Sequence, residues 1–186
     1  MTDDLEYEGI FPDDDAPIPT ADDKPRPGEL YKKWFRTPSQ AGFLSISPWR
    51  ETGMVAIDIG EVKDGQLSRA TKCYVSAIEL TAYLRGACDT NFMHYGGAQV
   101  EGKPVSRVFK VEPTDNNRFL GNCGHFEARR SDTGAYIPNM KNSLSQNMIQ
   151  VTPDEMRQIC LRLELALFGW AAADPEWITK INEKRS

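Results

Sequence analysis

A short sequence phrase occurs twice in this chain, and it limits the fold more than any other feature. The first copy spans residues 75–80 (VSAIEL) and the second spans residues 151–156 (VTPDEM). In each copy a serine or threonine stands three residues before a glutamate, which is the capping-box pattern of a helix N-terminus. A β-like stretch precedes each copy. The chain is therefore predicted to contain two units in which strands lead directly into a helix.

Alternation of apolar and polar residues predicts the strands of both units. In the first unit we expect strands at 31–36, 42–49, 53–63 and 67–75, then a helix at 77–85. In the second we expect strands at 106–112, 119–130 and 146–151, then an amphipathic helix from 153 to about 170. Residues 87–104 are expected to be a connector, residues 135–145 to be irregular, and residues 175–183 to form a short helix. The predicted fold class is α+β, with two ββββα-like units of antiparallel sheets and packed helices.

The N-terminal 29 residues differ in charge from the rest of the chain. They contain ten acidic and two basic residues, a balance of −8, whereas residues 30–186 have a balance of +3. With little to bury, residues 1–29 are expected to be a disordered acidic arm. The remainder is expected to be one globular domain, with pseudo-repeated units at about 30–86 and 105–170 and a C-terminal helix. Such charge asymmetry is typical of nucleic-acid contact or of a regulatory tail.

Several classes of protein are disfavoured by the sequence. No apolar run approaches the ~20 residues that a membrane-spanning helix needs, and no secretory signal peptide is expected at the acidic N-terminus. The four cysteines are widely spaced and form no CxxC pair, which favours reduced thiols in a cytoplasmic protein.

Motifs that would indicate an enzyme are absent from the sequence. It lacks GxSxG, HExxH and the phosphate-binding GxxxxGK[ST] pattern. Cys123 and His125 could supply two metal ligands, with Cys88 and His94 as distant partners, but structural zinc usually uses tighter spacings. Ordinary strand residues are the favoured interpretation. We therefore expect a non-enzymatic protein without a metal or a cofactor.

Aromatic residues interleaved with basic residues recur along the predicted strands. Single-stranded nucleic acids are bound in this way, because bases stack on exposed rings while basic side chains contact the phosphates. The competing interpretation is that these aromatic residues belong to the core, as strand aromatics often do. The predicted nucleic-acid-binding residues are Lys32, Lys33, Trp34, Arg36, Trp49, Arg50, Arg69, Lys72, Tyr74, Arg107, Phe109, Lys110, Arg129 and Arg130.

Residues 54–65, 72–80 and 147–156 resemble the Whirly and transcriptional-positive-cofactor-four-like superfamily of single-stranded DNA-binding proteins. The resemblance is one of architecture and covers residues 30–170. It implies four curved antiparallel strands followed by a helix, with this unit made twice, and nonspecific binding of single strands across the sheets. The lysine-glycine-lysine signature of plant members is missing, so the resemblance implies a binding surface rather than matched binding positions.

Together these features predict a sequence-nonspecific single-stranded DNA-binding protein, serving as a replication or recombination accessory protein of a phage or plasmid. The acidic arm is expected to contact replication or recombination proteins, and no membrane partner is expected. Binding of RNA and formation of a homo-oligomer stay open. The alternative is a protein-interaction module or a DNA-mimicking inhibitor that acts on a host nucleic-acid enzyme. Most of the excess negative charge lies in the arm rather than in the body, which favours the first interpretation.

Overall fold

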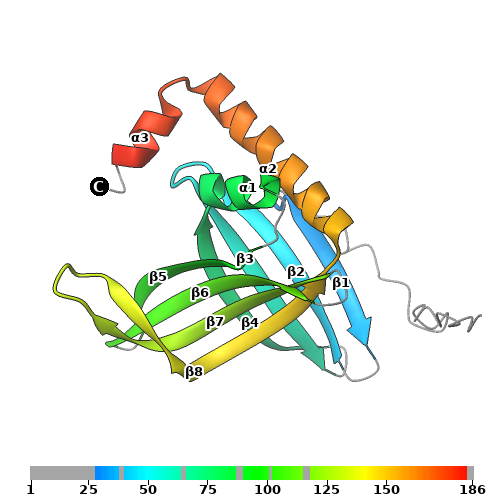
Figure 1. Ribbon diagram of the computed structural model, residues 1–186, viewed down its shortest axis with the longest axis vertical. Coiled ribbons are helices and arrows are strands. Elements are labelled where there is room, and N and C mark those ends of the chain that lie inside the picture. Colours follow the sequence, from blue (N-terminus) through cyan, green and yellow to red (C-terminus); the bar gives the residue numbers. More distant parts are fainter. Residues whose placement is uncertain are drawn as a thin grey trace, which may run out of the picture.

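The computed structural model describes residues 28–37, 40–63, 66–86, 90–100, 102–114 and 118–183. Residues 1–27, and with them nearly all of the expected disordered arm, lie outside the described residues. Four strands precede the first helix, and four more precede the second (Figure 1). The elements are β1 (Tyr31–Thr37), β2 (Gln40–Trp49), β3 (Met54–Lys63), β4 (Gln66–Ser76), α1 (Ala77–Arg85), β5 (Phe92–Val100), β6 (Lys103–Thr114), β7 (Arg118–Arg130), β8 (Tyr136–Val151), α2 (Pro153–Ala173) and α3 (Trp177–Glu183).

The strands form two antiparallel sheets in which neighbours in sequence are neighbours in space. The first sheet has the order β1-β2-β3-β4 and the second has the order β5-β6-β7-β8. This arrangement confirms the predicted α+β class with antiparallel sheets. In the described part of the chain, no helix combines the length and the hydropathy that crossing a membrane would require.

Both repeated phrases begin a helix, as the sequence predicts. At α2, the Glu155 amide donates to Thr152 Oγ1 over 3.3 Å, and the Thr152 amide donates to Glu155 Oε2 over 2.8 Å. At α1, the Glu79 amide donates to Ser76 Oγ over 3.3 Å. These bonds satisfy amide groups that the first helical turn leaves without an intrahelical partner.

The prediction of a connector at residues 87–104 was wrong, because β5 occupies Phe92–Val100. Gly96 and Gly97 make this strand difficult to predict from the sequence, since glycine normally weakens a strand. One of them is needed for packing: the Tyr136 ring lies where a Cβ on Gly97 would stand.

The irregular segment predicted at 135–145 was also wrong, because β8 already begins at Tyr136. Its pairing with β7 shifts register twice, between His125 and Phe126 and again between Phe126 and Ala128. Extra residues at such irregularities break the period-two pattern by which a strand is recognised in sequence.

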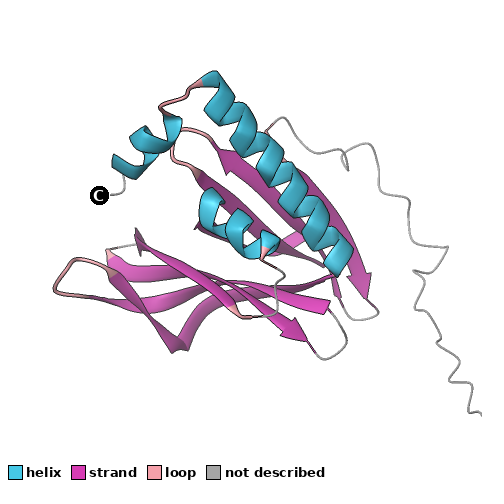
Figure 2. Cartoon of the chain, turned by 45° about the horizontal axis from the view of Figure 1, so that its top comes forward, coloured by secondary structure: helices cyan, strands magenta, loops and turns pink. Residues whose placement is uncertain are grey.

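The two sheets share one core with α1 and α2, which lie on the same side of the sheets (Figure 2). Val55, Ile57 and Ile59 point into this core and are at most 1% exposed, as their alternation predicts. The predicted apolar face of α2 is also present: Met156, Ile159, Cys160 and Leu163 are buried.

Buried hydrogen bonds connect the two sheets. Asn147 Nδ2 on β8 donates to the Ile59 carbonyl over 3.1 Å and to Thr71 Oγ1 over 2.9 Å. The Cys73 thiol on β4 donates to the Val108 carbonyl on β6 over 3.1 Å. Because buried polar groups are costly without partners, these bonds fix how the second sheet is placed against the first.

Candidate nucleic-acid interface

A groove of about 710 Å³ lies on the face of the first sheet that points away from the core. We call it the outer-face groove. Its lining residues are Gly28, Glu29, Lys32, Trp34, Phe43, Ser45, Ser47, Pro48, Trp49, Asp58, Ala70 and Lys72.

The antiparallel register brings these side chains together from strands far apart in sequence. Lys32 pairs with Ser45, Ser45 with Asp58, and Asp58 with Lys72, so one row of four polar residues crosses the sheet. The neighbouring row begins with Trp34 opposite Phe43. Because side chains alternate between faces along a strand, residues two positions apart in one strand contribute to successive rows.

Two tryptophans are the large exposed aromatic groups of the groove. Trp34 is 43% exposed and Trp49 is 46% exposed. The Trp34 ring lies 5.5 Å from the Phe43 ring, and the Trp49 ring lies 5.7 Å from the Tyr74 ring. These ring contacts help to hold each tryptophan while leaving much of its surface open for stacking.

The charges of the groove are balanced, with two lysines against two carboxylates. Lys32 Nζ lies 5.2 Å from the centre of the Trp34 ring, and Lys72 Nζ lies 3.4 Å from Asp58 Oδ2. The hydroxyl of Ser45 donates to the carboxylate of Glu29. Burial raises the pKa of Asp58 above its usual value, and the lysine beside it only partly counteracts this.

The second sheet extends this surface past β4. The Arg107 guanidinium lies 5.4 Å from the centre of the Tyr74 ring, and His125 Nε2 lies 2.9 Å from the Lys72 carbonyl oxygen. Arg107 Nε is buried and has no hydrogen-bond partner among the described residues. A row of aromatic and cationic groups thus runs from Trp49 over Tyr74 to Arg107.

The structure brings six of the sequence-predicted residues to this region. Lys32, Trp34, Trp49 and Lys72 line the groove, while Tyr74 and Arg107 continue it. Successive side chains of β1 point to opposite faces of the sheet. Lys33 therefore lies on the face away from the groove, where its Nζ is 2.6 Å from Glu155 Oε1.

The other predicted residues lie elsewhere. Phe109 is part of the core and only 7% exposed. Lys110 forms an ion pair with Glu112, and Arg69 forms one with Glu61 over 3.2 Å. The remaining three whose surroundings are described are exposed, Arg50 in the turn after β2 and the pair Arg129 and Arg130 at the end of β7. The side chain of Arg36 lies outside the described residues.

Eight of the twelve lining residues were not among the predicted binding residues, and Phe43 and Glu29 are two of them. Phe43 lies on the same face of β2 as Trp49, so the alternation of side chains along β2 could have predicted it. Glu29 was assigned to the arm, and nothing in the local sequence connects it with Ser45, sixteen residues away.

Those suggested metal ligands that the structure describes do not form a cluster. The Cys123 thiol donates to the Ile57 carbonyl inside the core over 3.5 Å, whereas His125 contacts the Lys72 backbone. Burial raises the pKa of the Cys123 thiol, with further contributions from the neighbouring Cys73. No group of three or more potential metal ligands occurs among the residues that the structure describes. Cys88 lies outside them.

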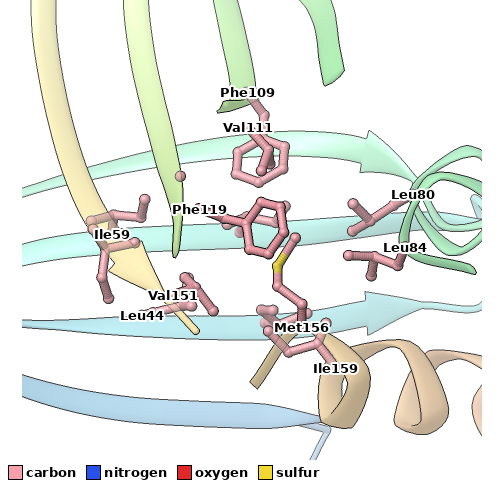
Figure 3. Close-up of a pocket in the computed structure, with 14 residues that line it drawn as sticks. Leu44, Ile59, Leu80, Leu84, Phe109, Val111, Phe119, Val151, Met156 and Ile159 are labelled. Atoms are coloured by element: carbon pink, nitrogen blue, oxygen red, sulfur yellow. The ribbon is translucent and has the colours of Figure 1, made fainter. Parts of the chain in front are cut away.

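A second cavity lies in the core, between the sheets and the helices (Figure 3). Its volume is about 30 Å³, and its walls include Leu44, Phe109, Phe119 and Met156. A space of this size holds about one water molecule, and apolar walls offer no partners for it. We interpret it as a packing void rather than a ligand site.

No protein-family model matches this chain, and no curated protein matches its sequence. These comparisons do not bear on the resemblance to Whirly-like proteins, which stays a prediction. The geometry of the outer-face groove is therefore the basis for the functional proposal.

Proposed function

We propose that this protein binds single-stranded nucleic acid without strong sequence preference, in the outer-face groove, and catalyses no reaction there. The observation that carries the proposal is the joint opening of two half-exposed tryptophans and two lysines into one groove. Stacking of a base on an aromatic side chain contributes about 1–3 kcal/mol and tolerates any base. The two lysines are placed to contact the phosphates between stacked bases.

Entry of a phosphate would compete with Glu29. Its carboxylate accepts the Ser45 hydroxyl at the groove floor, so it already occupies a position suited to an anion. When Glu29 leaves, Ser45 becomes a free donor, and the groove changes from a neutral to a positive balance. Binding is therefore expected to be coupled to displacement of this residue.

We further propose that the nucleic acid is single-stranded DNA and that the protein acts as a cytoplasmic accessory protein in replication or recombination of a phage or plasmid. The acidic segment before Gly28 would contact proteins of the same process, because its charge disfavours DNA.

A titration distinguishes the contribution of the two tryptophans to binding from the general effect of removing an exposed aromatic side chain. Fluorescence polarisation with labelled oligo-dT should show weaker binding for Trp34→Ala and Trp49→Ala, by about fivefold or more each, since each loses one stacking platform. Tyr95→Ala is a matched control, because Tyr95 is 44% exposed but lies on β5 and does not line the groove. Absence of binding at micromolar protein and low salt, or equal losses in all three variants, would contradict the proposal.

A second candidate is a protein-docking groove, and the balanced charge of the groove favours it. A neutral aromatic groove suits a polypeptide better than a polyanion, as expected for an inhibitor of a host nucleic-acid enzyme. Capture of a host nuclease or polymerase by the pure protein, together with no retention of oligo-dT, would select this candidate. Loss of that capture in Trp34→Ala would place the contact in the groove.

A further inference from the structure

The end of the β7–β8 hairpin extends past its neighbours in the second sheet. β6 pairs with β7 only as far as Glu127, so residues 128–130 of β7 pair with β8 alone, opposite residues 136–138. We call these two segments, with the turn between them, the ribbon; it lies at the left of Figure 1. The Tyr136 ring lies against Gly97 of β5 and holds the ribbon on the sheet.

A large bulge in β8 separates the ribbon from the rest of the sheet. The pairing moves from Phe126 with Ser143 to Ala128 with Pro138, so four residues of β8, 139–142, stand opposite one residue of β7. We call residues 139–142 the bulge. Bulges re-aim side chains and are frequent next to functional sites, so what this one presents to solvent is informative.

The bulge is braced, and it presents apolar and basic side chains together. Asn142 Nδ2 donates to Glu127 Oε2 over 2.7 Å, which ties the bulge to β7. Met140 is 47% exposed, and Leu144, just after the bulge, is 56% exposed. Lys141 stands exposed next to Met140.

The cations of the ribbon and the bulge are available to an anionic partner. Arg129, Arg130 and Lys141 are exposed, and none of the three forms an ion pair with another residue in the described part of the chain. The same segments contain two carboxylates, and the one on Glu127 already accepts the Asn142 amide. The excess of charge is therefore positive, beside exposed apolar side chains.

We propose that the ribbon and the bulge bind double-stranded DNA, and that the protein binds at junctions between a single strand and a duplex. A two-stranded β-ribbon fits into a DNA groove, where Arg129, Arg130 and Lys141 would contact phosphates. Methionine is among the apolar side chains that insert between base pairs, and Met140 is placed for this role. The duplex contact goes beyond the proposed function and does not depend on it; only the preference for a junction rests on both.

The single-strand surface ends close to the bulge. The row from Trp49 over Tyr74 to Arg107 continues in register to His125 on β7 and to Ser145 on β8. Ser145 is three positions after the end of the bulge at residue 142, which is about 10 Å along a strand. A strand that leaves a duplex at the bulge is thus placed to enter the single-strand surface.

An anionic membrane is the other partner that combines these chemistries, since lipid surfaces also attract basic and apolar side chains. Segments that lie in a membrane surface commonly anchor with aromatic residues at the headgroup level. Residues 139–144 (NMKNSL) contain no aromatic residue. The bulge therefore favours a DNA duplex.

The test is a fluorescence-polarisation titration of the full chain with oligo-dT, a blunt duplex, and the same duplex with a dT tail. We expect binding of the blunt duplex at micromolar protein in low salt. The tailed duplex should bind about tenfold tighter or more than either separate DNA, because two linked contacts add avidity.

The double variant Arg129→Ala/Arg130→Ala should weaken duplex binding. Each phosphate contact with B-DNA contributes about −0.9 to the slope of log K against log salt, so the slope should become shallower by about 1.8. The Kd for oligo-dT should stay the same, which also shows that the variant is folded. Lys63→Ala/Arg157→Ala is the matched control, because it removes the same charge from exposed sites on β3 and α2.

Met140→Gln separates the apolar contact from the ionic ones. It keeps the length of the side chain but should weaken duplex binding, while the salt slope stays unchanged because an apolar contact releases no counterions. Equal losses in the two double variants, or no duplex binding by a chain that binds oligo-dT, would overturn the proposal. Binding to phosphatidylserine vesicles without duplex binding would overturn it in favour of a membrane. Duplex binding without oligo-dT binding would support the ribbon and contradict the groove, so the two failures are distinguishable.

Discussion

Single side chains decide what the outer-face groove can bind. Trp34 and Lys32 stand two residues apart on β1 and share a face, whereas Lys33 between them is turned to the core side and paired with Glu155. A basic residue next to an aromatic one in sequence is therefore on the opposite face of the strand, while a residue two positions away is on the same face.

Replacing Glu29 by glutamine should strengthen nucleic-acid binding. The carboxylate would repel an entering phosphate by about 1 kcal/mol at contact distance in water, which corresponds to about a fivefold tighter Kd in Glu29→Gln. The measurement is the oligo-dT titration in low salt. Glu176→Gln, in the turn before α3, removes the same charge at a residue that does not line the groove and should leave the Kd unchanged. An equal gain in both variants would mean that only net charge matters.

At the scale of elements, the start of α2 is also the point where the helix is attached to the first sheet. Glu155 closes the capping box and its Oε1 pairs with Lys33 Nζ on β1. Burial alone would raise the pKa of Glu155, but the bonds from Lys33 and Thr152 together lower it below its usual value. One carboxylate thus serves both the local helix signal and the tertiary contact.

Glu155→Gln should lower the free energy of unfolding by about 1–2 kcal/mol at pH 7, since it weakens hydrogen bonds that involve a charged group. A lowered pKa means that the folded state holds the proton less tightly than the unfolded state. The carboxylate therefore stabilises the fold above its unfolded pKa of about 4.3, and this contribution is lost as the pH falls through the folded pKa.

Urea unfolding at pH 7 and at pH 3.5 measures this dependence. The difference between the natural sequence and Glu155→Gln should shrink at the lower pH. Glu164→Gln on the same helix breaks a pair with the exposed Arg85, and it should cost no more than about 0.5 kcal/mol. A difference that is the same at both pH values would contradict the role of the charge.

At the scale of the whole molecule, the number of cations that reach one strand of nucleic acid depends on how the sheets are placed. The groove offers Lys32 and Lys72, and the second sheet adds Arg107. Other predicted cations, such as Arg129 and Arg130, stand at the far end of β7.

The salt dependence of binding should reflect the small number of cations that contact the nucleic acid. Each phosphate contact on a single strand contributes about −0.7 to the slope of log K against log salt, so about three contacts give a slope of roughly −2. Lys32→Met should make the slope shallower by about 0.7. A slope much steeper than roughly −4 would indicate that the nucleic acid also contacts cations outside the groove.

Much of the fold could be predicted from local sequence, and less of the site. Strand alternation located β1 to β4, and the capping phrases located the first residues of α1 and α2. Strand alternation did not predict β5 or the early part of β8. In β5 the Tyr136 ring occupies the space that a Cβ on Gly97 would need, and in β8 irregular pairing with β7 interrupts the period-two pattern. These features are set by neighbours that are distant in sequence.

The sequence by itself determined where the helices begin, which residues alternate on each strand and how unevenly the charge is distributed. Those properties depend on residues within a few positions of each other, so they can be read along the chain. Only the tertiary structure decided which aromatic and basic residues share a groove, that Glu29 enters it, and that the outward face of α2 stays uncovered. The physical reason is that cross-strand register and sheet packing are set by long-range contacts, such as the bonds from Asn147 to Ile59 and Thr71.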